Sequence, residues 1–317
     1  MRTHLAIVVT AILFAAVAAT ARADGLPLLG SGTGPAGIEA PNGHVRFATL
    51  PAGHGTVLVS TERIGGHVVG YRYFDERLTI PNVAYDGSVG GLSRDGSTLV
   101  LMRPRVGFPQ RETAFALVGT KGLKVVDRVT LHGDFSFDAI SPDGGTLYFI
   151  QYLSRRDPTR YAVRAYDVQA GRFLREPIVD RSEPDEDMRG NPITRVTSPD
   201  GRWAYTLYDG GGMAPFIHAL DTVGAEAHCI DLDALAGRQD LFDLRLRLGG
   251  GTLAVTKRGV PLSVVDLATL RVSEPAPRPP SGGGGVPWLP IGAGAGALLT
   301  AAVSLVVLRR RKLALGT

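Results

Sequence analysis

ISPDGGTLYFI, at residues 140–150, is the clearest copy of a unit that recurs along this 317-residue chain. In this unit an Asp-Gly pair separates two short runs that are rich in β-branched and aromatic residues. Asp and Gly tolerate the positive φ of a tight hairpin turn, so the unit predicts two antiparallel strands. Four further copies read LPAGHGTVLVS (residues 50–60), LSRDGSTLVLM (92–102), TSPDGRWAYTL (197–207) and LGGGTLAVT (248–256).

The spacing of the copies predicts the architecture. Aligned on Thr56, Thr98, Thr146, Trp203 and Thr252, they are 42, 48, 57 and 49 residues apart. Periods of this length are typical of a four-stranded propeller blade. The run YAVRAY, at residues 161–166, alternates with the period of two that strands require, so helices are not expected. The sequence therefore predicts an all-β fold, a β-propeller of about five four-stranded blades with six as the alternative, over residues 43–275.

The SPDG turns at residues 141–144 and 198–201, each followed by an aromatic-rich strand, resemble those of the WD-like, YVTN-type and TolB-type β-propellers of bacterial envelopes. The resemblance covers roughly residues 43–275 and implies the propeller fold. It implies little about function, because SPDG is a turn device and these families include scaffolds, binding proteins and some enzymes.

Both ends of the chain predict export and anchoring. Residues 1–23 have the layout of a signal peptide, and residues 24–42 follow as a flexible leader. A Pro/Gly linker (276–285) then precedes an uncharged apolar segment (286–308), which is long enough to span a membrane, and the basic tail 309–317. Because cationic tails stay in the cytoplasm, we expect a single-pass membrane protein with its large domain outside the cytoplasm. Proteolytic processing of the anchor remains an alternative to its retention.

Charge and cysteine content narrow the function classes. Six of the 34 Lys and Arg residues, but none of the 30 Asp and Glu residues, lie in residues 1–23 and 309–317. The exported part therefore carries a net charge of about −2, which gives no support for nucleic-acid binding. Cys229 is the single cysteine, so no internal disulfide is expected and the hydrophobic core must supply the stability.

Catalytic and metal-binding motifs are missing from the sequence. It contains no G-x-S-x-G, H-E-x-x-H or Walker pattern, and its histidines are scattered singly. A formal G-x-G-x-x-G at residues 32–37 has no strand before it, and the acidic run 183–187 lacks the spacing of a calcium loop. We therefore expect a non-catalytic protein with no catalytic, cofactor or metal site.

A set of cationic residues is the main candidate for a binding surface. In four of the five units the loop between the second and third strands carries basic side chains, and in a propeller these loops emerge on one face. Such a face could clamp a carboxylate or phosphate, which favours a binding or scaffold module for an unknown protein or an anionic envelope polymer. The candidate residues are Arg63, Arg103, Arg105, Arg155, Arg156, Arg160, Lys257 and Arg258.

A propeller-type hydrolase or lactonase with a site at the central channel is the alternative function. It would need several carboxylates or histidines on the inner strands. These strands offer Asp138 and otherwise arginines, among them Arg195.

The expected topology gives a first testable prediction. Protease added to intact cells with an accessible surface should trim the protein to a small membrane fragment, because only residues 309–317 are expected inside. Full protection of the protein in such cells would contradict this topology.

Overall fold

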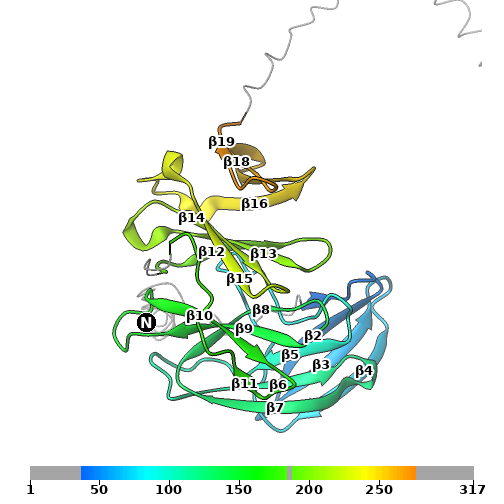
Figure 1. The fold of residues 1–317 in the computed structure, drawn as a ribbon. Coiled ribbons are helices and arrows are strands. Elements are labelled where there is room, and N and C mark those ends of the chain that lie inside the picture. Colours follow the sequence, from blue (N-terminus) through cyan, green and yellow to red (C-terminus); the bar gives the residue numbers. More distant parts are fainter. Residues whose placement is uncertain (1–36, 184–187, 276–317) are drawn as a thin grey trace, which may run out of the picture. The chain divides into compact units, whose positions relative to one another are not determined.

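The computed structural model describes residues 37–183 and 188–275 (Figure 1). The chain divides into two units, residues 1–275 and 276–317, and all described residues belong to the first. Within the described ranges no helix is long and apolar enough to cross a membrane. The expected signal peptide (1–23), linker (276–285), membrane segment (286–308) and tail (309–317), and most of the leader (24–42), lie outside them.

Strands dominate the described residues and form five antiparallel sheets. The first sheet contains β1 (Ile38–Glu39), β2 (Val45–Ala52), β3 (Gly55–Glu62) and β4 (Val68–Phe74). The second contains β5 (Thr98–Met102), β6 (Glu112–Gly119) and β7 (Lys124–His132). The third contains β8 (Phe135–Ile140), β9 (Thr146–Tyr152), β10 (Tyr161–Asp167) and β11 (Arg172–Phe173). The fourth contains β12 (Pro192–Thr197), β13 (Trp203–Tyr208), β14 (Phe216–Asp221) and β15 (Glu226–Asp231). The fifth contains β16 (Leu244–Gly249), β17 (Thr252–Lys257), β18 (Val260–Asp266) and β19 (Val272–Ser273).

The helices of the described part are short 3₁₀ turns. They are η1 (Lys121–Leu123), η2 (Gly210–Gly212), η3 (Asp233–Leu235) and η4 (Leu241–Asp243). The strands of each sheet follow the order of the chain, so within a sheet each strand pairs with the next one along the sequence. The second sheet has three strands, and an isolated bridge from Leu92 to Leu99 continues its inner edge. We therefore count the segment at Leu92 as the first strand of this sheet, and β5, β6 and β7 as its second, third and fourth.

The predicted turns join the first and second strands of the later sheets. In the third sheet the Ser141 hydroxyl donates to the Asp143 carboxylate, which accepts from the Gly145 amide, while the Thr146 amide donates back to the Ser141 hydroxyl. Gly144 has a φ of 77°, a conformation that costs glycine nothing. The hydrogen bonds from Ser141 and Gly145 hold the pKa of Asp143 below its usual value.

The first unit begins one strand earlier than we predicted. Its innermost strand is β1, and the turn at Asn42-Gly43 joins β1 to β2. Thr56 therefore lies on the third strand, so its alignment with Thr98 was wrong. The sheet also begins at Ile38, ahead of the predicted domain start at residue 43.

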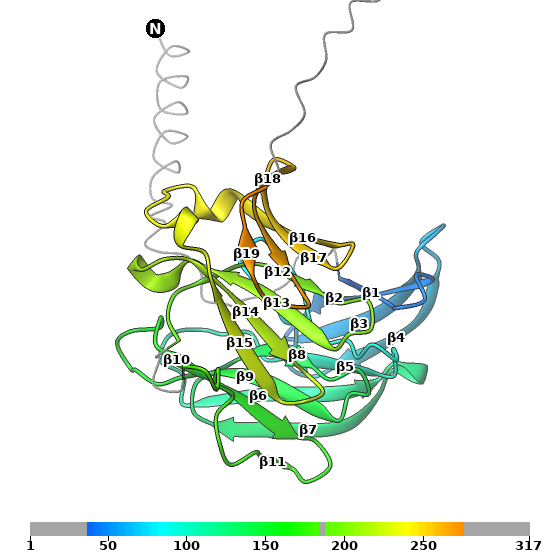
Figure 2. The same cartoon turned by 45° about the horizontal axis from the view of Figure 1, so that its top comes forward.

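Consecutive sheets share hydrophobic cores. Four clusters of buried side chains join the first sheet to the second, the second to the third, the third to the fourth and the fourth to the fifth. The fourth sheet accordingly lies between the third and the fifth in both views (Figures 1 and 2). Radial sheets of this kind, each with its first strand innermost, are consistent with a β-propeller.

The two ends of the sheets form two sides of the domain. Turns between first and second strands, and between third and fourth strands, lie on what we call the first-turn side. There the Asp95 amide of the second sheet donates to the Pro142 carbonyl of the third at 2.9 Å. Loops between second and third strands, and the connections between sheets, lie on the opposite, loop side.

A hairpin at residues 81–90 follows the first sheet. Its Val83 and Ser88 are hydrogen-bonded to each other, and its tip donates from the Tyr85 and Asp86 amides to the Pro192 and Ile193 carbonyls. A β-bulge at Ile193 interrupts the pairing of β12 with β13, which leaves that carbonyl available. The hairpin thus ties the connection after the first sheet to the innermost strand of the fourth.

The core contains a buried histidine, His218. The His218 side chain on β14 is fully buried, and neither ring nitrogen has a hydrogen-bond partner within the described residues. Burial lowers the pKa of His218 from 6.5 to about 4. The folded protein therefore keeps this imidazole neutral where the unfolded chain would protonate it.

We predict a pH-dependent loss of stability from this group. Because the folded pKa is depressed, the contribution of neutral His218 is complete above pH 6.5 and is lost between pH 6.5 and about 4. This loss amounts to about 3 kcal/mol of the free energy of unfolding. Urea denaturation of the wild type and His218→Phe at several pH values should show a flatter dependence for the variant in this window. Parallel curves would contradict the assignment.

Candidate functional site

The structure separates the predicted cationic residues into four groups. The loops between second and third strands do carry Arg103, Arg105, Arg155, Arg156 and Arg160, together with Lys257 and Arg258 at the turn of the fifth sheet. Arg63 does not belong with them. It follows β3, on the first-turn side, where its Nε donates to the Gly43 carbonyl at 3.1 Å. The reason is that β1, and not β2, is the innermost strand of its sheet.

Arg105 is a buried structural residue. Its side chain is 4% exposed and forms an ion pair with Asp134, which is 5% exposed, at 2.5 Å. The guanidinium also donates to the Phe135 carbonyl and the Ser136 hydroxyl, and its carbon lies 4.8 Å from the centre of the Tyr152 ring. The expectation of an exposed binding arginine at this position was therefore wrong.

Acidic residues pair with further members of the set. Arg103 lies 3.8 Å from Glu76, and Lys257 pairs with Asp240 and Asp243. Four further members of the set are exposed, and three of them share the loop of residues 153–160. The four are Arg155, Arg156, Arg160 and Arg258.

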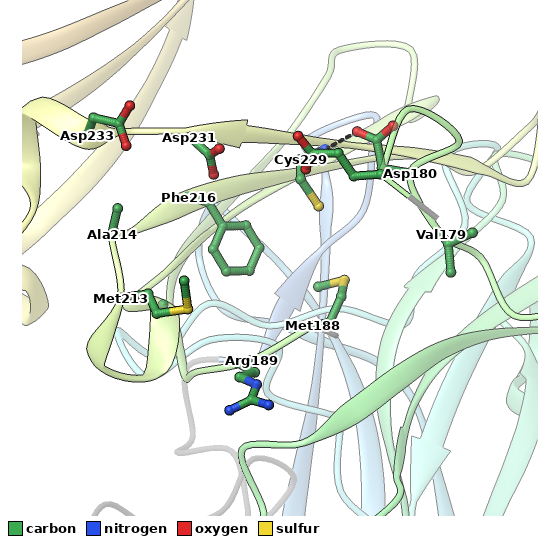
Figure 3. A pocket seen from close by; sticks show the side chains of 12 residues that line it. Val179, Asp180, Met188, Arg189, Met213, Ala214, Phe216, Cys229, Asp231 and Asp233 are labelled. Atoms are coloured by element: carbon green, nitrogen blue, oxygen red, sulfur yellow. Dashed lines mark hydrogen bonds between the residues drawn. The ribbon is translucent and has the colours of Figure 1, made fainter. Parts of the chain in front are cut away.

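A pocket of about 590 Å³ lies on the same side, at the edge of the fourth sheet (Figure 3). We call it the outer pocket. Its apolar walls come from three separate segments and include Met188, Met213 and Phe216, whose side chains converge in Figure 3. This volume is within the usual range for small-molecule sites.

Carboxylates border the outer pocket. Asp180, Glu183, Asp231 and Asp233 line it, together with Arg189. Burial, reinforced by Glu183 and Asp233, raises the pKa of Asp231. Crowded carboxylates of this kind favour a cationic group between them.

Hydrogen bonds fix one wall of the outer pocket. Asp180 accepts from the Ser182 amide and hydroxyl with one oxygen and from the Cys229 amide with the other, at 2.7 Å. The backbone of Asp180 also forms an isolated parallel β-bridge with that of Ala227. This bridge links the segment between the third and fourth sheets to β15, the outermost strand of the fourth sheet. The carboxylate is therefore held in place against β15.

The loop of residues 153–160 adjoins the outer pocket. The Gly190 amide donates to the Thr159 carbonyl at 3.3 Å. The backbone of Arg160 forms an isolated antiparallel β-bridge with that of the pocket residue Arg189. We call the two features together the loop-side surface. It combines exposed cations, an acidic border and an apolar recess within one contiguous region.

Sequence reasoning missed the outer pocket. Met188, Met213 and Phe216 look like ordinary loop and strand residues, and only the fold brings them together. The acidic run 183–187 was the available signal. Glu183 of this run does line the pocket, and residues 184–187 lie outside the described ranges.

Comparisons with known proteins concern the fold. No protein-family model and no curated protein matches the chain. Similar solved structures include TolB from Acinetobacter baumannii, with 15% identity, a TM-score of 0.40, and coverage of 74% of this chain and 52% of that one. They also include the Cps50 (Swd1) β-propeller domain from Myceliophteria thermophila, with 12% identity, a TM-score of 0.45, and coverage of 77% and 71%. Hydrazine synthase from Kuenenia stuttgartiensis is a third, with 15% identity, a TM-score of 0.43, and coverage of 75% and 70%. At these values no function is transferred to this chain.

The burial of Arg105 gives a stability prediction. Arg105→Ala should lower the free energy of unfolding by about 3–5 kcal/mol, because it leaves the Asp134 carboxylate buried without its cation. Arg155→Ala, in an exposed loop, is the control and should change it by no more than about 0.5 kcal/mol. Urea denaturation measures both, and equal effects would refute the distinction.

Proposed function

We propose that this protein is a non-catalytic binding module, a five-bladed β-propeller that binds another protein through its loop-side surface. The observation that carries the proposal is the contiguity of the outer pocket with the exposed cationic loop of residues 153–160. A rigid scaffold that presents irregular loops on one side is a common arrangement for recognition.

The mixed chemistry of this surface favours a polypeptide partner. A uniformly anionic polymer would meet the arginines favourably, but the carboxylates of Asp231 and Asp233 would repel it. A protein can place acidic side chains against Arg155 and Arg156 and a basic or apolar side chain in the pocket. Complementary charges of both signs fix the register of such a complex and exclude wrong partners.

The proposal includes the location expected from the sequence. Export by residues 1–23 and anchoring by residues 286–308 would hold the domain outside the cytoplasm, joined to the membrane by the Pro/Gly linker. A tethered module meets a partner in the same envelope at a raised effective concentration.

Site-specific photo-crosslinking in the native host tests the proposal. A photoreactive amino acid at Met213, which is 70% exposed at the outer pocket, or at Leu153, which is 55% exposed in the cationic loop, should form a discrete protein adduct. The same amino acid at Lys121, on the first-turn side, should not. Arg155→Ala combined with Arg156→Ala should reduce the adduct at least about fivefold, because each lost charge pair is worth roughly 1 kcal/mol.

The matched control replaces two exposed lysines of the first-turn side. Lys121→Ala combined with Lys124→Ala removes the same charge and should leave the adduct unchanged. If neither loop-side position yields a protein adduct while the protein sediments with anionic envelope polymer in a salt-sensitive way, the partner is a polymer and the protein-binding proposal fails.

A further inference from the structure

A second cavity, on the first-turn side, lies among the innermost segments of the first four sheets. We call it the inner cavity. Its volume is about 290 Å³, at the small end of ligand sites, so it suits a small molecule and not a polymer. Its lining includes Glu39, Arg94, Asp138, Arg195 and Thr197. None of these residues contributes to the loop-side surface.

Asp138 occupies a β-bulge in the inner strand of the third sheet. Phe137 pairs with Phe149 and Ala139 with Tyr148, so Asp138 has no opposite residue on β9. A bulge re-aims the side chain of the extra residue and frees its backbone groups. The freed Asp138 carbonyl accepts a hydrogen bond from Nη1 of Arg195.

The two oxygens of the Asp138 carboxylate differ in their interactions. Its side chain is 2% exposed, and Oδ1 pairs with Nη2 of Arg195, which is 6% exposed. Arg195 is held in turn by a 2.6 Å hydrogen bond from Nε to the Thr206 hydroxyl. Oδ2 of Asp138 is buried and has no hydrogen-bond partner within the described residues. A buried carboxylate oxygen in this state gains free energy from any donor that reaches it.

A cation lies at the rim of the same cavity. Arg94 is exposed, and no carboxylate of the described residues forms an ion pair with it. Its stem packs against the turn of the fourth sheet, where a Cβ on Gly201 would lie 2.6 Å from the Arg94 Cβ and 3.0 Å from its Cγ. This contact positions the base of the arginine at the cavity while the guanidinium stays accessible. The other charged rim residue, Glu39, is paired with Arg46 at 2.6 Å.

We propose that the inner cavity binds a small zwitterion of the α-amino-acid type. Its ammonium group donates to Oδ2 of Asp138 in the interior, and its carboxylate pairs with the Arg94 guanidinium at the rim. Charge-assisted hydrogen bonds at both ends give a stronger and more selective site than either contact alone. The proposal is independent of the loop-side surface, because the two regions share no lining residue.

Isothermal titration calorimetry of the full-length protein with each proteinogenic amino acid tests this proposal. One or a few amino acids should bind. The corresponding amine without the carboxylate, and the acid without the amine, should each bind at least about tenfold more weakly, since a hydrogen bond to a charged group is worth about 1.5–3 kcal/mol. A dipeptide with the same first residue separates a free amino acid from a peptide end as the natural ligand.

Three variants define the contacts. Arg94→Ala should weaken the amino acid at least about tenfold and leave the amine unchanged, with Lys121→Ala as the charge-matched control. Thr197→Trp, at an exposed lining position, should abolish binding by filling the cavity. Asp138→Asn should abolish binding of both amino acid and amine, and if this variant does not fold, the first two still decide.

Failure of the proposal has a clear signature. It is overturned if no amino acid binds, or if binding survives both Arg94→Ala and Thr197→Trp. Binding of the amine as tightly as the amino acid would overturn the role of Arg94. Crosslinking through Met213 or Leu153 is not affected by these variants, so the two proposals fail separately.

Discussion

The Ser-Asp turn between first and second strands is the interaction on which the rest of the fold depends. In the second, third and fourth sheets a serine hydroxyl donates to an aspartate two residues later and accepts from the amide that opens the next strand. Each turn thereby sets the register of an inner strand against its neighbour. Since the side-chain period of a strand is two, a slip of one residue would turn the whole buried face outward.

Two of the arginines in the domain are neutralised by buried aspartates and do not add to an exposed cationic surface. Arg105 and Arg195 are both buried against an aspartate, and in each pair the removal of one partner would leave a costly isolated charge. Arg155 and Arg156 on the loop side are exposed instead. Arginines of this domain thus differ in burial: two are held in buried ion pairs, and others are open to solvent.

The strands and turns of the later sheets were predictable because Asp-Gly is a local signal. The first sheet was misaligned because its first turn, Asn42-Gly43, begins within the predicted leader, while the turn at Gly53-His54 joins β2 to β3 at nearly the same spacing from the later turns. The side of the cationic loops could be predicted for seven of the eight residues, and the error at Arg63 follows from this misalignment.

The sequence pattern could not predict the environments of individual side chains. The burial of Arg105 depends on Asp134, which the loop reaches only through the tertiary fold. The sequence places Asp138 and Arg195 on inner strands, but their pairing and the bulge at Asp138 could not be derived from spacing. The outer pocket combines residues from three segments, so no local motif marks it.

The hairpin of residues 81–90 has a consequence for the order in which the protein assembles. Neighbouring sheets share cores, so the first three can pack one after another before the fourth has formed. The bonds from Tyr85 and Asp86 to Pro192 and Ile193 close a loop that contains the whole of the second and third sheets. Closing it must wait for the fourth sheet, and the entropy of this long loop slows the step. Until then the two amides of the hairpin tip lack these carbonyl partners, so the docking of this hairpin is expected to be among the last steps of folding.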